Sequence, residues 1–268
     1  MTSTTDVPRG LAGVVVADTE IGDVRGLEGF YHYRQFSAIE LATKRSFTDV
    51  WHLLAYGDLP TSDEFATRTA ALRAVPDALA RVLPEIAAAT AGPMDGLRAA
   101  LSIAGSLLGL RPVIDLSPDQ RREDTLAISA MTPTILAALY RLQNGRQPVA
   151  PRADLGVAAN YLYMVTGTEP DPAHARAIEK YLIATIDHGF NASTFTARVI
   201  ASTGADLVAC LLGALGALSG PLHGGAPSRA LDTLDAIGTP DRADAWIRAR
   251  VLAGERIMGF GHPIYRTE

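Results

Sequence analysis

Helix-start signals recur along almost the whole chain from Ser37 onward, and they constrain the fold more than any other feature. Ser37 is followed three residues later by Glu40, and Ser46 by Asp49, which is the spacing of a capping box. Thr239-Pro240 places an N-cap residue before a proline at the first helical position. The sequence therefore predicts an all-α fold, built from many helices joined by short loops.

The predicted helices follow one another with short gaps. The helix that starts at Ser46 is expected to end near Gly57, and the next to open at residues 61–64. Further helices are expected over residues 76–89, 94–109, 118–143, 153–166, 171–186, 192–203, 206–218, 224–236 and 240–253. Pro133 lies inside one of these patterns, and its missing N–H and its ring predict a kink or a break there.

Only the segment before Tyr33 carries a β pattern. Gly13–Ala17 is predicted to form a short strand, and Thr19–Ile21 to return beside it as a hairpin partner. No internal repeat and no long low-complexity linker interrupts the rest of the chain.

The composition argues against several classes of partner. The 268 residues are 48% hydrophobic and carry a net charge of −5. Such a chain can bury a sizeable core, and it has no general electrostatic reason to bind nucleic acid or an acidic membrane. The N-terminus lacks the features of a signal peptide, and the longest apolar run is shorter than the roughly 20 residues of a membrane span. A soluble cytoplasmic protein is the expectation.

The cysteine and histidine spacings disfavour a metal site. Cys210 is the only cysteine, so no disulfide can form within the chain, and its apolar surroundings predict a buried thiol. The six histidines are far apart, and no His-x-x-x-His pair occurs.

Residues 191–220 are rich in small side chains, with Gly213, Gly216 and Gly220 among them. Small side chains let helix backbones approach closely. Two readings are equally open at this point: a central helix pair that also forms a subunit interface, or ordinary packing within one chain.

Three histidines lie among glycines and small polar residues, in segments 187–193, 220–225 and 259–263. Glycine allows a ligand to approach the backbone, and histidine supplies a donor, an acceptor or a proton near neutral pH. One such segment alone is more often a structural turn. Three in one chain favour a histidine-lined site for an anionic ligand.

Two of these histidines have suggestive neighbours. His223 is expected at or just before a helix start, where a neutral imidazole could donate a hydrogen bond to a developing enolate oxygen. His262 lies in a glycine loop followed by Arg266, and such a loop can wrap a cofactor while the arginine meets its phosphates.

These three segments closely resemble the signature segments of citrate synthases, in the order and at about the spacing of that family. The resemblance extends over nearly the whole chain. It is supported by the residues Gly26–Gly29, Tyr33-Arg34, Leu53–Pro60, Pro93–Asp95 and Asn160–Met164.

The resemblance implies an almost entirely helical homodimer whose active site lies between a large and a small domain. Residues 1–224 would form the large domain with the dimerisation helices. Residues 225–268 would form the first part of the small domain.

The resemblance also implies roles for individual residues. His188 would bind oxaloacetate, His223 would polarise the thioester carbonyl of acetyl-CoA and stabilise its enol, and His262 would hydrogen-bond the oxaloacetate carbonyl. Asn191 and Ser193 would shape the site near the first two histidines.

The loop Gly259, Phe260, Gly261, together with Arg266, would contact CoA. The resemblance implies no metal or redox cofactor. Acetyl-CoA is used as a substrate.

The family pattern continues past Glu268 into an oxaloacetate-binding Asp-Pro-Arg and, further on, the catalytic aspartate. We therefore expect the native chain to be longer, and the 268 residues alone to be inactive. Gly189-Phe190 and Pro227 also depart from the common family residues, without removing a catalytic group.

Three functions stay open on the sequence: citrate synthase, 2-methylcitrate synthase acting on propionyl-CoA, and an inactive truncated helical dimer. The two enzymes differ by one methylene in the acyl group, which a pocket discriminates by only about 1–3 kcal/mol.

Overall fold

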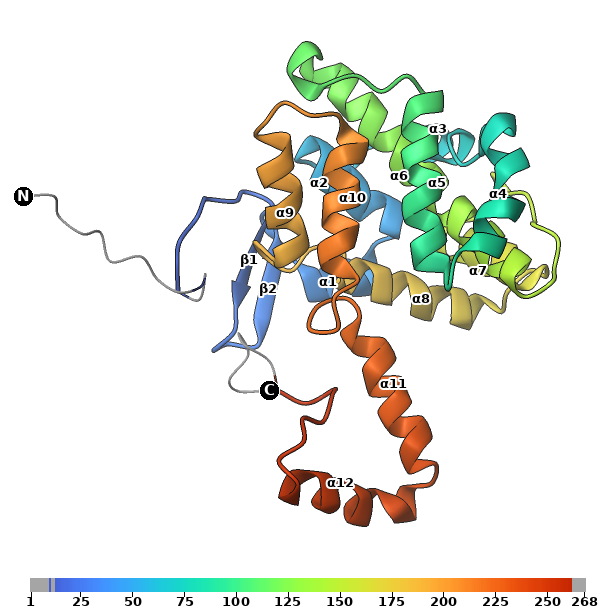
Figure 1. The fold of residues 1–268 in the computed structure, drawn as a ribbon. Coiled ribbons are helices and arrows are strands. Elements are labelled where there is room, and N and C mark those ends of the chain that lie inside the picture. Colours follow the sequence, from blue (N-terminus) through green and yellow to red (C-terminus); the bar gives the residue numbers. More distant parts are fainter. Residues whose placement is uncertain (1–9, 11–12, 262–268) are drawn as a thin grey trace, which may run out of the picture.

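The computed structural model describes residue 10 and residues 13–261, which fold mainly into helices around a small N-terminal sheet (Figure 1). The three strands pair antiparallel in the order β1-β2-β3. They are β1 (Gly22–Arg25), β2 (Phe30–Tyr33) and β3 (Phe36–Ser37). The α-helices are α1 (Ala38–Lys44), α2 (Phe47–Tyr56), α3 (Glu64–Ala71), α4 (Asp77–Ala89), α5 (Pro93–Leu107), α6 (Pro118–Gln143), α7 (Val157–Thr166), α8 (Pro172–Ala184), α9 (Ala192–Ala201), α10 (Leu207–Leu218), α11 (Ala226–Ile237) and α12 (Ala243–Leu252). Two short 3-10 helices are η1 (Val113–Asp115) and η2 (Pro240–Arg242).

The predicted N-terminal hairpin is wrong in position. Residues 13–21 form no strand, and the observed hairpin lies further on, with Gly22 opposite Tyr33. Its turn includes Gly29 at φ 62°, a backbone conformation that glycine adopts without strain. Val15 is 89% exposed, because no neighbouring strand pairs with its segment. The apolar run alone favoured a strand, but pairing requires the turn that Gly26–Gly29 supplies.

The helices confirm most of the sequence prediction. α6 has the expected bounds, and Ser46 forms the expected capping box with Asp49, each bond measuring 3.1 Å. At the other predicted box, Ser37 caps α1 but the carboxylate of Glu40 bonds to Lys44 instead. Most other bounds differ from the prediction by one or two residues. The larger differences are that α7 begins at residue 157 rather than 153, and that the segment predicted as 240–253 divides into η2 and α12.

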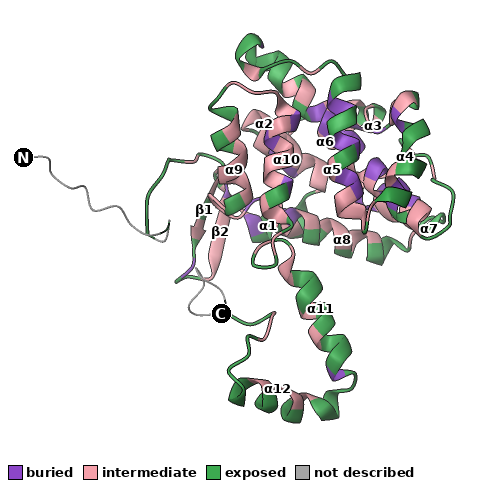
Figure 2. Ribbon diagram, in the orientation of Figure 1, coloured by how far each residue is buried: buried purple, intermediate pink, exposed green. Residues whose placement is uncertain are grey.

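α6 is the central helix of the core. It runs as one helix past Pro133, so of the expected kink or break, the break does not occur. By length and composition alone, α6 is long and apolar enough to cross a membrane. Half of its most apolar 18-residue window, however, is buried inside the protein. Its buried residues belong to the main core together with buried residues of α4, α5 and α10 (Figure 2). Packing in this core therefore explains the apolar composition of α6.

A second, smaller core joins the sheet to the helices. Tyr33 from β2, Leu41 from α1, Leu53 from α2 and Ile183 from α8 are all almost fully buried in it. This cluster fixes the sheet against the C-terminal end of α8.

α9 and α10 pack against each other at very short range. A Cβ added to Gly213 would lie 2.2 Å from the Cδ1 atom of Ile200, whereas one added to Gly216 would meet nothing within 4 Å. The small residues therefore serve packing within the chain at Gly213, and the expectation of close helix packing is confirmed. Cys210, on the same helix, is buried as predicted.

α11 and α12 project from the rest of the molecule (Figure 1). Ile237 is the only buried residue between 226 and 252. The boundary between large and small domain near residue 224 stays a prediction.

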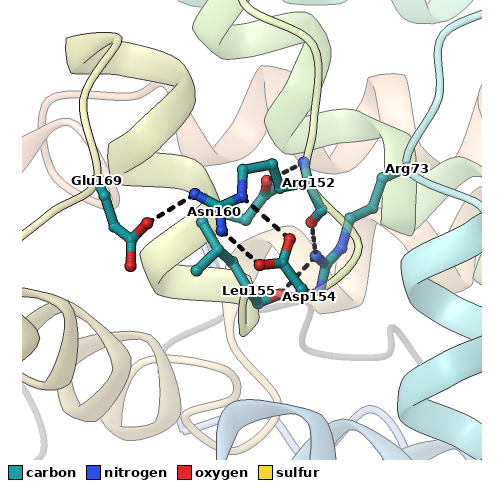
Figure 3. Close-up of polar contacts among 6 residues, drawn as sticks. All are labelled: Arg73, Arg152, Asp154, Leu155, Asn160 and Glu169. Carbon is teal, nitrogen blue, oxygen red and sulfur yellow. Dashed lines mark hydrogen bonds and ion pairs between the residues drawn. The ribbon is translucent and has the colours of Figure 1, made fainter.

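A polar network fixes the loop between α6 and α7 (Figure 3). The buried guanidinium of Arg73 donates to the carbonyl oxygens of Arg152 and Leu155, at 2.8 and 2.7 Å. Asn160 accepts from the backbone N–H of Arg152 at 2.8 Å, and the Arg152 side chain pairs with Asp154 and, at 2.7 Å, with Glu169. Burial lowers the pKa of Arg73, so its hydrogen bonds offset a desolvation cost.

Candidate active site

One cavity of about 1870 Å³ is lined by two of the histidine segments and by the described part of the third, Gly259–Gly261. Its wall is formed by β1, the start of α5, the end of α8, the loop into α9, the loop between α10 and α11, and the chain after α12. Segments nearly 240 residues apart in the sequence thus share one wall.

Most of the predicted site residues lie in this wall. They are His188, Asn191, Ser193, His223, Gly259, Phe260 and Gly261. His262 and Arg266, also predicted, lie outside the described residues.

Asn191 is the N-cap of α9, and its side chain is held in one orientation. Its Oδ1 atom accepts from the backbone N–H of Thr194 at 3.0 Å and from the hydroxyl of Ser193 at 2.7 Å. Its Nδ2 atom lies 3.3 Å from the carbonyl oxygen of Gly189, to which it donates. Because the N-cap partner is a donor, the oxygen and nitrogen of this amide cannot be exchanged.

The Ser193 hydroxyl links this amide to His223. Its Oγ atom lies 2.9 Å from the Nε2 atom of the imidazole. A hydroxyl has one hydrogen, and an amide oxygen cannot donate. While Ser193 donates to Asn191, it must therefore accept from His223, which places a proton on Nε2.

This arrangement has a consequence for the other ring nitrogen. Nδ1 of a neutral His223 is then an acceptor. If the Ser193 hydrogen turns to Nε2, the neutral ring carries its proton on Nδ1 and becomes a donor there. One hydroxyl rotation thus selects the tautomer.

The loop that carries His223 is too tight for side chains next to the histidine. A Cβ on Gly224 would lie 2.4 Å from Leu218 Cδ1 and 2.7 Å from Leu218 O, and one on Gly225 would lie 2.9 Å from Gly220 O. These glycines therefore let the chain turn back on the end of α10 directly before α11 begins. His223 lies just before the start of α11, as the sequence predicted.

The loop that carries His188 follows the end of α8. The His188 ring meets the Tyr31 ring edge-on, with centroids 5.6 Å apart. Asp187 is buried, and its carboxylate accepts from the backbone N–H of Gly189 at 3.1 Å. Burial raises the pKa of Asp187, while the hydrogen bonds from the backbone of Gly189 and His188 oppose that shift.

Sequence reasoning missed several charged residues of the wall. Asp95 and Arg98, an ion pair on the first turns of α5, line the cavity, and so do Asp23 and Arg256. The segment Pro93–Asp95 was noted only for its family likeness. Nothing local in the sequence indicates that α5 begins at this cavity.

Within the described part of the chain, no group of three or more His, Cys, Asp or Glu side chains is placed to hold a metal ion.

Comparison with known proteins gives a consistent result. Residues 10–268 match the family described as "Citrate synthase, C-terminal domain". The citrate synthase of Deinococcus radiodurans is 40% identical over 97% of this chain and 69% of its own length. The 2-methylcitrate synthase of Mycobacterium tuberculosis is 39% identical over 97% of this chain and 66% of its own length.

Solved structures agree with these relatives. The citrate synthase of Pyrobaculum aerophilum superposes with a TM-score of 0.87 at 37% identity, covering 95% of this chain and 66% of that one. That of Thermoplasma acidophilum, a ternary complex with carboxymethyl coenzyme A and oxaloacetate, has a TM-score of 0.88 at 24% identity, covering 97% and 70%. The chain spans about two thirds of the length of the proteins it matches. With these matches over nearly its whole length, and with His188, His223 and the loop Gly259–Gly261 around one cavity, the chain belongs to the citrate synthase family of enzymes.

Proposed function

We propose that this protein condenses oxaloacetate with the acyl group of an acyl-CoA thioester, and that the described cavity is the larger part of its active site. The observation that carries the proposal is the convergence of His188 and His223 in that cavity, with His223 bound through Ser193 to Asn191. Fold likeness alone would not be sufficient, because one fold hosts many chemistries.

His223 acts on the thioester. A C–H beside a thioester carbonyl is a weak acid, and removing its proton needs a base together with a donor on the developing enolate oxygen. Nε2 of His223 is engaged by Ser193, so Nδ1 is the nitrogen that remains for the substrate. It becomes a donor in the neutral ring once the Ser193 hydrogen turns from Asn191 to Nε2.

His188 acts on the other substrate. It binds oxaloacetate in the ground state, from the loop that Asp187 and Tyr31 hold. His262 contributes a hydrogen bond to the oxaloacetate carbonyl; this role rests on the family likeness.

The loop after α12 binds CoA. Gly259 and Gly261 have φ values of 98° and 78°, which bring backbone groups rather than side chains to the cavity wall. Phe260 between them is 72% exposed. Arg266, beyond the described residues, is proposed to meet the phosphates.

Two acyl groups are candidates. Relatives of nearly equal identity are named citrate synthase and 2-methylcitrate synthase. Acetyl-CoA would give citrate, the first step of the tricarboxylic acid cycle, and propionyl-CoA would give 2-methylcitrate. We favour acetyl-CoA, because the similar proteins named citrate synthase include both the Deinococcus radiodurans relative and the Pyrobaculum aerophilum structure.

We propose that the protein is a cytoplasmic homodimer and that it needs no metal or redox cofactor. The open side of Gly216 on α10 supports a second copy packing there, since none of the described residues comes within 4 Å of a Cβ added at this position.

The test is release of free CoA by the protein expressed from its complete gene, with oxaloacetate and either acetyl-CoA or propionyl-CoA. We expect turnover with both thioesters and a higher kcat/KM for acetyl-CoA. No CoA release by the complete, folded protein with either thioester would refute the proposal.

A further inference from the structure

One face of the N-terminal sheet lies against the segment that carries His188. Gly22 and Val24 of β1 stand directly opposite Tyr33 and Tyr31 of β2. Residues two apart in a strand, and residues opposite one another across a ladder, point to the same face of a sheet. These four residues therefore form one surface, which we call the tyrosine face.

The two tyrosines of this face cap the end of α8. The hydroxyl of Tyr33 donates to the carbonyl oxygen of Ile183 at 2.7 Å, and that of Tyr31 to Ala184 at 2.8 Å. The last carbonyls of a helix lack partners within the helix. The sheet satisfies two of them, directly before the loop that carries His188.

The two small residues of the face touch the loop itself. A Cβ added to Gly22 would lie 2.8 Å from Oδ2 of Asp187, and one added to Gly189 would lie 3.1 Å from Cγ2 of Val24. Asp187 in turn accepts from the N–H of Gly189 and so closes the turn around His188. The Tyr31 ring meets the imidazole itself.

We propose that the tyrosine face and Asp187 are positioning elements that set the orientation of the His188 imidazole, and thereby the affinity for oxaloacetate. Both sides of His188 are held: the helix end before it by two phenol hydroxyls, and the turn after it by a carboxylate. Such packing from outside a ligand set fixes side-chain orientation in binding sites. The proposal rests on the proposed function in its identification of oxaloacetate as the ligand.

The test compares Tyr31→Phe and Asp187→Ala with the unaltered protein from the complete gene. Tyr31→Phe removes a hydroxyl but keeps the ring. Each change is expected to weaken oxaloacetate binding, measured by calorimetry, by about two- to tenfold, the value of one hydrogen bond. The maximal rate at saturating oxaloacetate should change less than twofold, and Asp187→Asn, which keeps an acceptor, should recover most of the affinity.

One control variant and one further measurement make the outcome decisive. Tyr56→Phe removes a phenol hydroxyl that accepts from Arg68, and neither residue lines the cavity, so it should leave oxaloacetate affinity unchanged. The NMR signals of the His188 ring, assigned with His188→Gln, should shift in ligand-free Tyr31→Phe and stay in place in Tyr56→Phe. Unchanged affinity and unchanged ring signals in folded Tyr31→Phe and Asp187→Ala would overturn the proposal. If the unaltered protein bound no oxaloacetate, the proposed function would fail, and the ring signals alone would decide whether the face positions His188.

Discussion

At the scale of single residues, the key group is the hydroxyl of Ser193. It stands between an amide oxygen that only accepts and an imidazole that can do either. Asn191 therefore acts on His223 without touching it, because it competes for the one hydrogen that decides the tautomer.

Ser193→Ala removes this link without adding bulk. We expect kcat to fall by about two- to tenfold, the value of one hydrogen bond, with oxaloacetate affinity unchanged. The measurement is steady-state kinetics of CoA release. Ser193→Thr, which keeps the hydroxyl, is the matched control and should retain more activity; equal losses in both variants would contradict the role given to the hydroxyl.

The sequence identified the residues of this site that belong to compact motifs, and it missed those that come from elsewhere. Asn191, Ser193 and His223 stand in short glycine-rich segments with a recognisable order. Tyr31 carries no local signal that links it to His188, because that contact depends on where the sheet packs, more than 150 residues away in the chain.

At the scale of elements, two glycines of α10 have different surroundings: one packs against α9 and the other does not. Gly213 faces Ile200 of the neighbouring helix at a distance that leaves no room for a methyl group. Gly216, three residues on, faces open space. One helix thus offers one face to its own chain and another to the outside.

Substitutions at these two glycines should affect different properties, the stability of the chain at Gly213 and its association at Gly216. Gly213→Ala is expected to lower the free energy of unfolding by about 1–3 kcal/mol through overpacking, without changing the association state. Gly216→Leu should leave packing within the chain intact but give monomer or aggregate. Urea unfolding and light scattering measure the two effects. A stable dimer of unchanged mass in Gly216→Leu would place the subunit interface elsewhere.

Helices were predictable here and strands were not. The bounds of α6 follow from Ser117, Pro118 and a long apolar periodicity, all of which are local. The hairpin at residues 22–33 is stabilised by its turn and by packing against the end of α8, neither of which is visible as a local apolar pattern. The segment at residues 13–17 is more apolar and therefore looked more like a strand. Pro133 does not break α6, since surrounding helices hold it in the core.

At the scale of the whole molecule, the cavity depends on loops that the core holds in place. The Arg73 network ties the loop between α6 and α7 to the end of α3 (Figure 3). It serves the stability of the fold, and none of its residues lines the cavity.

Arg73→Met should separate stability from catalysis. It leaves two carbonyl oxygens without their donor, so the free energy of unfolding should fall by about 2–4 kcal/mol. Arg152→Met removes partly exposed ion pairs and a cation–π contact with Tyr163, and should cost about 1 kcal/mol. Denaturant unfolding checks both values. An equal loss in the two variants would show that the buried bonds of Arg73 do not carry the network.

We propose that His188 and His223, which line one cavity, act at different stages of one reaction. The most direct test is the pair His223→Gln and His188→Gln in the complete protein, with kcat and oxaloacetate affinity measured for each. His223→Gln should lower kcat by about 100- to 1,000-fold, as loss of a preorganised donor to an oxyanion does, with little change in affinity. His188→Gln should instead weaken oxaloacetate binding. The reverse pattern would exchange the two roles, and two variants with unaltered kinetics would contradict the account.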